Sequence, residues 1–208
     1  MIRALPRLVL ALLTLPMAAG LGVSFAPAFG GGFAALWAWP GLGRAMALSA
    51  GTGVVSTGLA LGLTGLIVGM LHDRPAFAVL RRMLSPLLAV PHAAAALGLA
   101  FLLAPSGWLI RLASPWATGW ALPPDLLILN DPMGLALTLG LVAKELPFLL
   151  LMALAALPAC APGPRLATAA ALGHGRLSGF AVAVWPPLYA RLRLPVLAVM
   201  AYGMTTVE

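Results

Sequence analysis

Charge is scarce in this chain. Only 8% of its 208 residues are Asp, Glu, Lys or Arg, whereas 62% are hydrophobic. A water-soluble domain of this size needs roughly a quarter charged residues to cover its surface. The composition therefore excludes a soluble globular domain and predicts a protein that lies in a membrane.

Cysteine and acidic residues are scarcer still. Cys160 is the single cysteine, which excludes an internal disulfide, and the five acids and three histidines form no cluster with metal-ligand spacing. No Gly-Lys-Ser/Thr phosphate-binding motif is present, so the chain does not bind ATP by that route. We therefore expect no cofactor, no metal and no catalytic residues.

Five apolar segments are long enough, or nearly long enough, to cross a bilayer, which takes about 20 residues of helix. They cover residues 8–25, 45–71, 83–104, 132–157 and 194–208. We expect an all-α, polytopic transmembrane helical bundle in which residues 1–208 form one domain. The last segment has only fifteen residues, about 22 Å of helix against a hydrocarbon core of about 30 Å. We therefore expect the chain to stop inside its fifth span, as a piece of a longer protein.

The first segment allows two interpretations. Arg3 and Arg7 precede an apolar run, and Ala18, Ala19 and Gly20 are small residues of the kind found near a signal-peptide cleavage site. The apolar character continues past that point, however, and the later spans share it. This continuity favours a retained span over a cleaved signal peptide.

The basic residues predict the orientation of the spans. If the N-terminus is cytoplasmic, Arg44 and Arg111 lie outside, Lys144 lies within a span, and the other nine basic residues lie inside. The nine are Arg3, Arg7, Arg74, Arg81, Arg82, Arg165, Arg176, Arg191 and Arg193. Basic residues collect in cytoplasmic loops, so the net charge of +7 reports orientation in a bacterial inner membrane and not nucleic-acid binding.

The long outer loop, residues 105–131, precedes the fourth segment. Asp131 stands directly before Pro132, the arrangement typical of a helix N-cap followed by proline in the first turn. The loop also carries tryptophans, which favour the membrane surface; they are Trp108, Trp116 and Trp120. We expect this loop to lie at the outer interface.

Glycines recur through the second segment. Gly58 with Gly62, and Gly65 with Gly69, have the four-residue spacing that lets transmembrane helices approach closely. We expect these glycines to serve helix packing first and a dimer face second.

Residues 159–193 differ from their surroundings because they are rich in small residues and carry four of the arginines. Pro162 and Pro164 can start a helix, which the Ala-rich residues 166–172 favour. Gly173 and Gly175 then allow a sharp bend. A second short helix over residues 176–184 is expected to end at Pro186-Pro187, so we predict a cytoplasmic helix–turn–helix.

Residues 167–186 resemble the cytoplasmic signature of permease subunits of ATP-binding-cassette importers. That signature reads Glu-Ala-Ala, three residues, Gly, nine residues, Ile, one residue and Leu-Pro. Aligned without gaps, three of its positions match in full, at Ala169, Gly173 and Pro186. The others differ: Ala167 stands where the Glu would be, Thr168 for the first Ala, Ala183 for the Ile and Trp185 for the Leu.

Two further segments are similar to the branch of these permeases that includes thiamine, iron and sulfate-type importers. They are the outer-loop residues 105–116 and the Lys-Glu-Leu-Pro-Phe-Leu-Leu-Leu of residues 144–151. Such permeases often fuse two halves in one chain, and the resemblance covers nearly the whole of this one. It implies the N-terminal half of an importer permease, with thiamine as a possible substrate.

The resemblance also implies partners. Residues 159–193 would bind a cytoplasmic ATP-binding subunit, a periplasmic substrate-binding protein would deliver substrate, and a second permease half or a homodimer partner would complete the path through the membrane lipid. The implied coupling residues are Arg165, Ala167, Thr168, Ala169, Gly173, Arg176 and Pro186. Because the signature's acid is missing at Ala167, Arg165 is the expected substitute anchor.

Three ionisable residues fall inside predicted spans. Lys144 and Glu145 lie in the fourth, followed by Pro147, and His92 follows Pro91 in the third. Ionisable groups are expensive inside a membrane and mark candidate translocation paths. Alternatively they hold the bundle together, and adjacent residues on a helix need not pair with each other because they point about 100° apart.

Three other functions compete with the importer permease. A secondary transporter would use Lys144, Glu145 and His92 as a proton relay and would need no ATPase. An intramembrane enzyme would combine His92 with Ser85 or Ser106, neither of which has a convincing nucleophile setting. A structural scaffold would need none of these residues. The importer permease is the leading interpretation, with ATP hydrolysed by a separate subunit.

Overall fold

A computed structural model of the chain describes residues 5–125 and 131–206. These residues form helices joined by turns, with no strand among them. The chain divides into two compact units, Met1–Met46 and Ala47–Glu208. The all-α fold expected from the sequence is therefore confirmed for the described part of the chain.

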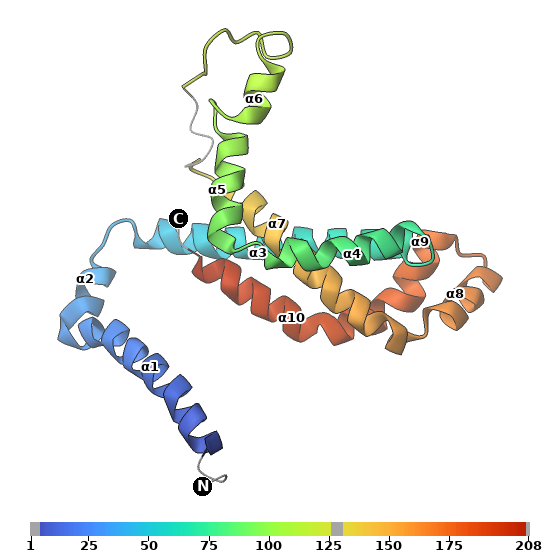
Figure 1. The fold of residues 1–208 in the computed structure, drawn as a ribbon, viewed down its shortest axis with the longest axis horizontal. Helices are drawn as coiled ribbons and strands as arrows, with labels where there is room; N and C mark the ends of the chain where they lie inside the picture. The colour runs from blue at the N-terminus through green and yellow to red at the C-terminus, as the bar shows by residue number, and fades with distance from the viewer. Residues whose placement is uncertain (1–4, 126–130, 207–208) are drawn as a thin grey trace. The chain divides into compact units, whose positions relative to one another are not determined.

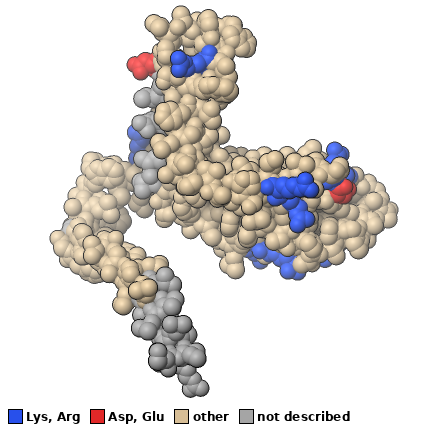
Figure 2. All heavy atoms as spheres, in the orientation of Figure 1, with Lys and Arg blue, Asp and Glu red and all other residues tan. Residues whose placement is uncertain are grey.

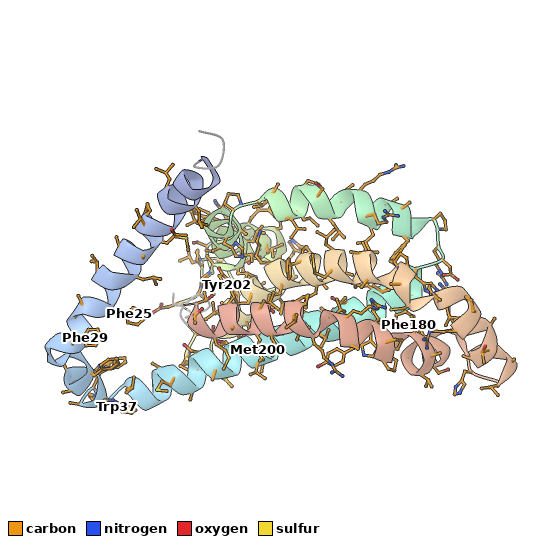
Figure 3. All side chains as sticks on the ribbon, turned by 90° about the horizontal axis from the view of Figure 1, so that it is seen from below. Phe25, Phe29, Trp37, Phe180, Met200 and Tyr202 are labelled. Atoms are coloured by element: carbon orange, nitrogen blue, oxygen red, sulfur yellow. The ribbon has the colours of Figure 1, made fainter. Side chains whose placement is uncertain are left out.

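The first unit is a helical arm. It contains α1 (Leu5–Pro27), a π-helical turn η1 (Ala28–Gly32) and α2 (Phe33–Trp37), and α3 (Leu42–Leu71) begins at its end. Its large apolar side chains, such as Phe25, Phe29 and Trp37, project away from the backbone and are exposed (Figure 3). Such a surface is costly in water and suits a lipid surrounding.

The second unit is built on a bundle of α3, α4 (Ala76–Ala89), α7 (Leu135–Ala156) and α10 (Trp185–Thr205) (Figure 1). These helices meet in a core of fully buried side chains, among them Val68, Leu84, Leu149, Leu188 and Leu192. Lipid tails are as apolar as leucine, so close packing, more than escape from water, stabilises such a core in a membrane.

Glycines let α3 approach residues 180–204, a stretch that includes α10. A Cβ at Gly53 would lie 2.6 Å from the Met204 side chain, and one at Gly65 would lie 3.0 Å from the Trp185 ring. Gly69 meets Phe180 in the same way. Gly58, in contrast, has open space around it, as does Gly62. Of the two predicted pairs, Gly65 with Gly69 thus packs inside the described part of this chain, whereas Gly58 with Gly62 does not.

Three helical stretches in the described residues are long and apolar enough to cross a membrane: Leu42–Leu71, His92–Ala113 and Leu135–Cys160. The first and third correspond to the predicted second and fourth spans. The predicted single span over residues 83–104 is wrong, because α4 ends at Ala89 and α5 (His92–Leu103) starts a new direction (Figure 1). Val90 is extended before Pro91, as the residue before a proline prefers.

The predicted fifth segment also needs correction, because its helix starts earlier than residue 194. A continuous helical run comprises α9 (Arg176–Gly179), the π-helical η3 (Phe180–Val184) and α10, which ends at Thr205. The expectation that Pro186-Pro187 would end a helix is wrong. Both prolines stand in the first turn of α10, just after the π-helical segment, where the α-helical hydrogen-bond ladder is already interrupted.

The cap predicted before α7 needs correction, because α7 begins at Leu135 after the left-handed Gly134, and Asp131 is therefore not its N-cap residue. Asp131 still bonds the start of the helix. The Asp131 carboxylate accepts hydrogen bonds from the Leu135 N–H at 2.7 Å and the Ala136 N–H at 3.0 Å. These bonds lower the pKa of Asp131 and satisfy two of the N–H groups that a helix start leaves without partners. Asn130, which precedes it, lies outside the described residues.

The two glycine environments on α3 give opposite predictions. Gly53→Ala should lower the free energy of unfolding by roughly 1–3 kcal/mol, because the new Cβ would meet the backbone of Gly203 and Met204. The control, Gly58→Ala, should raise it by about 0.4–1 kcal/mol through chain entropy. Unfolding by SDS in mixed micelles measures both, and equal effects would contradict the α3–α10 contact.

Candidate functional site

The segment predicted to face the cytoplasm forms one end of the second unit, which we call the basic end. It comprises η2 (Leu157–Cys160), α8 (Pro162–Ala171), a turn and α9. Figure 2 shows basic side chains over this end. The arginines of this segment and of the helices that adjoin it are Arg74, Arg81, Arg82, Arg165, Arg176, Arg191 and Arg193.

Gly173 has a backbone role that explains the glycine. It ends α8 with φ of +85°, a left-handed conformation in which a side chain would be strained. Its N–H donates to the Ala170 carbonyl at 3.0 Å, and the His174 N–H donates to the Ala169 carbonyl at 3.0 Å. This pair of bonds closes the end of α8 and turns the chain toward α9.

Arg165 joins α8 to η3. Its Nη1 donates to the Ala183 carbonyl at 3.3 Å. In an α-helix that carbonyl would accept from the N–H of residue 187, which is a proline and has none. The Arg165 guanidinium therefore supplies a donor that the sequence removed, and the buried Ala169 packs α8 against Gly179.

Arg176 joins α9 to the end of α3. Its guanidinium forms a two-pronged contact with the Asp73 carboxylate, with Nη1 to Oδ2 at 3.0 Å, and its Nη2 also donates to the Met70 carbonyl at 2.9 Å. Partial desolvation raises the pKa of Asp73, but the hydrogen bond from Arg176 and the nearby charges outweigh it and leave the pKa below its ordinary value.

The outer face of α8 has no partner within the described residues. Ala167, Thr168 and Leu172 are exposed, and Leu172 is 74% exposed. The Thr168 hydroxyl is occupied by its own helix, since it donates to the Pro164 carbonyl at 3.1 Å. Pro186 is also exposed at the start of α10. Of the signature positions, Ala169 is thus buried, and Ala167, Thr168, Gly173 and Pro186 are exposed.

The opposite end of the bundle holds the second group of candidates, beginning with Glu145. Its side chain is buried between α3, α7 and α10, and its Oε1 accepts a hydrogen bond from the Ser56 hydroxyl at 3.2 Å. A Cβ at Gly203 would lie 3.1 Å from the same oxygen. Glu145 does not pair with Lys144.

Lys144 points to the break between α4 and α5. Its Nζ donates to the Val90 carbonyl at 2.5 Å. Val90 lies between the two helices, so its carbonyl belongs to neither ladder, and an unpaired carbonyl at membrane depth costs several kcal/mol. The lysine thus supplies the hydrogen bond that the Val90 carbonyl would otherwise lack at the helix break before Pro91.

His92 completes this group. Its ring lies 5.2 Å from the Tyr202 ring, centroid to centroid, and Tyr202 is the neighbour of Gly203 on α10 (Figure 3). The three candidate path residues therefore have separate partners, and no side-chain hydrogen bond or ion pair joins them to each other in the described part of the chain. Sequence reasoning missed Ser56, Thr57 and Tyr202; the recurrence of Ser and Thr along α3 was the signal for the first two.

Comparison with known proteins adds no relative. No family model, curated protein or solved structure matches the chain. Its described residues also contain no group of three or more His, Cys, Asp and Glu side chains that could hold a metal ion. Assignment of function therefore depends on the two ends of the bundle.

The Arg176–Asp73 contact predicts a pH dependence. Because the folded-state pKa of Asp73 lies below 3.8, the contact adds stability above that pH and loses it as the pH falls through the lower folded-state value. The melting temperature of wild type should therefore exceed that of Asp73→Asn near neutral pH, and the two should converge in acid. A constant difference at every pH would contradict an ionic contact.

Proposed function

We propose that the chain is a permease subunit of an ATP-binding-cassette importer and that residues 159–193 contact its cytoplasmic ATP-binding subunit. The observation that carries the proposal is the setting of α8. This short helix presents an exposed face of small residues, while its other side is fixed to the bundle by Arg165 and Ala169. A rigidly mounted helix with a free face suits transmission of movement from a partner.

The contacts give this transmission a route. α8 is joined to η3 through the Ala183 carbonyl, and η3 continues into α10. The following α9 is joined to the end of α3 by Arg176. A displacement of α8 by a closing ATPase would therefore act on α3 and α10 together. The π-helical η3 and the two prolines after it interrupt the regular hydrogen bonding of the helical run from α9 to α10. This segment is therefore where the run would bend.

The charge distribution supports the proposed orientation. Seven arginines belong to the basic end and the helices that adjoin it, whereas Arg111 lies on α6 (Trp108–Ala113), within the predicted outer loop. In the bacterial inner membrane the basic end would face the cytoplasm, where an ATPase is found. We also propose that the chain crosses the membrane five times and that a second permease half completes the path.

A second candidate is a secondary transporter, favoured by the position of His92, Lys144 and Glu145 around one part of the bundle. Ionisable side chains inside a membrane bundle are typical of proton and ion pathways. Such a transporter would use the transmembrane ion gradient, so its uptake would resist vanadate and collapse with an ionophore.

The coupling proposal predicts the effect of one substitution on the free face of α8. Ala167→Arg should abolish co-purification of a vanadate-sensitive ATPase, because a long charged side chain would fill the exposed contact face without disturbing the buried side. Ala117→Arg, at an exposed position of the outer loop, is the matched control and should leave the ATPase in place. The assay is ATP hydrolysis by the affinity-purified complex from the native membrane.

Two further variants test transmission and not contact. Arg165→Ala and Gly173→Leu should leave ATP hydrolysis running but lower substrate uptake, since they loosen α8 from η3 and strain its end. Normal uptake in both variants, or an intact complex with Ala167→Arg, would refute the coupling role.

A further inference from the structure

Two hollows adjoin on the surface of the second unit, along α3 and the turn that follows it. The first, which we call the apolar groove, has a volume of about 310 Å³ and is lined by Gly62, Gly65, Leu66, Leu177, Phe180 and Trp185, among others. The second, the basic hollow, has a volume of about 400 Å³ and is lined by Met70, Arg74, Arg176 and Leu177, among others. Leu177 lines both, so the groove and the hollow form one continuous surface.

The apolar groove exists because glycines take the place of side chains on α3. A Cβ at Gly62 would meet nothing within 4 Å, and one at Gly65 would face the Trp185 ring. Phe180, labelled in Figure 3, is buried and forms part of the wall. From Gly62 to Met70 the helix rises about 12 Å, close to the depth of one leaflet, which is half of a hydrocarbon core of about 30 Å.

The basic hollow carries a positive charge that the described residues leave unbalanced. Arg176 is paired with the Asp73 carboxylate, whereas the Arg74 side chain forms no hydrogen bond or ion pair with any described residue. Asp73 and the Met70 carbonyl use three of the five N–H donors of Arg176, so two remain. The hollow therefore suits a singly charged anion, and guanidinium groups are good partners for phosphate oxygens.

We propose that the apolar groove and the basic hollow together bind one anionic phospholipid, with its phosphate at Arg74 and Arg176 and an acyl chain over Gly62 and Gly65. A phospholipid carries an apolar chain and a phosphate in the order in which α3 and its following turn present the groove and the hollow. Basic pockets between transmembrane helices bind acidic head groups in this way. A zwitterionic head group adds an ammonium that the arginines would repel, so a phosphodiester with an uncharged head group is favoured.

A lipid fits this surface better than a partner helix does. A helix in the groove would have to place an acidic residue opposite Arg74, whereas a lipid phosphate supplies that charge where the hydrocarbon ends. Lipid binding here is independent of the proposed ATPase contact, because the exposed α8 residues Ala167 and Leu172 line neither the groove nor the hollow.

The experiment counts the phospholipid bound to the purified full chain by native mass spectrometry. The detergent micelles contain phosphatidylglycerol or phosphatidylcholine with the same acyl chains. Wild type should retain one phosphatidylglycerol at a concentration at which it retains no phosphatidylcholine. Gly62→Leu should lose the bound lipid, because its Cβ enters open space and the rest of the side chain fills the groove. Arg74→Gln should weaken binding roughly fivefold.

Each variant has a matched control. Gly58→Leu places the same side chain about one turn earlier on α3, where a Cβ also meets nothing within 4 Å but the residue lines neither the groove nor the hollow. Arg82→Gln removes an exposed arginine of α4 that lines neither of them. Both controls should retain phosphatidylglycerol as wild type does.

Equal retention of the two phospholipids would refute the site, as would binding that Gly62→Leu or Arg74→Gln weakens no more than its control does. Release of the lipid by inorganic phosphate alone would show a site for a free anion instead. A lipid-free dimer that Gly62→Leu converts to a monomer would show that a second copy of the chain occupies the groove. If Gly62→Leu fails to fold, the comparison of Arg74→Gln with Arg82→Gln decides alone.

Discussion

The constraint on which this structure depends is that every main-chain carbonyl inside an apolar bundle needs a donor. Prolines and helix ends remove donors at several places, and the few cations of the chain replace them. Lys144 reaches the Val90 carbonyl and Arg165 the Ala183 carbonyl. Arg176 and Arg191 likewise reach carbonyls at the end of α3 and in η2. The scarcity of charge in the sequence makes this use of four cations notable, because each is committed to the backbone.

The carbonyls that these cations bind lie where the helices are irregular, and two of the cations are candidate functional residues. A helix break at membrane depth is tolerated where protein groups satisfy it, and such breaks are places where a bundle can change shape. The break at Pro91 and the π-helical segment before Pro186 lie near the two ends of the bundle, and each is held by a side chain from another helix. Lys144 and Arg165, chosen from the sequence as functional residues, thus have a structural role that does not depend on any substrate or partner.

Composition and charge were enough to predict an all-α fold with helices apolar enough to cross a membrane over residues 45–71 and 132–157, and a role for Asp131 at the start of the second, although not as its N-cap. Each rests on a local property: hydropathy over about 20 residues, or the side chain beside a helix start. The break at Pro91 and the run through Pro186-Pro187 were not predictable, because proline's effect depends on whether a distant side chain supplies the missing donor. Arg165 and Lys144 lie 18 and 54 residues from the carbonyls they bind.

The setting of Glu145 illustrates the same limit. Its burial could be expected from its span, but the partners Ser56 and Gly203 come from helices far apart in the sequence. The coupling loop and this carboxylate lie at opposite ends of the run from Arg176 to Thr205, which passes through the π-helical segment on the way. Any movement of α10 that starts at the basic end must be accommodated where Gly203 meets Gly53, since neither glycine has a side chain that could yield. The packing around Glu145 is therefore sensitive to the position of α10, whichever energy source moves it.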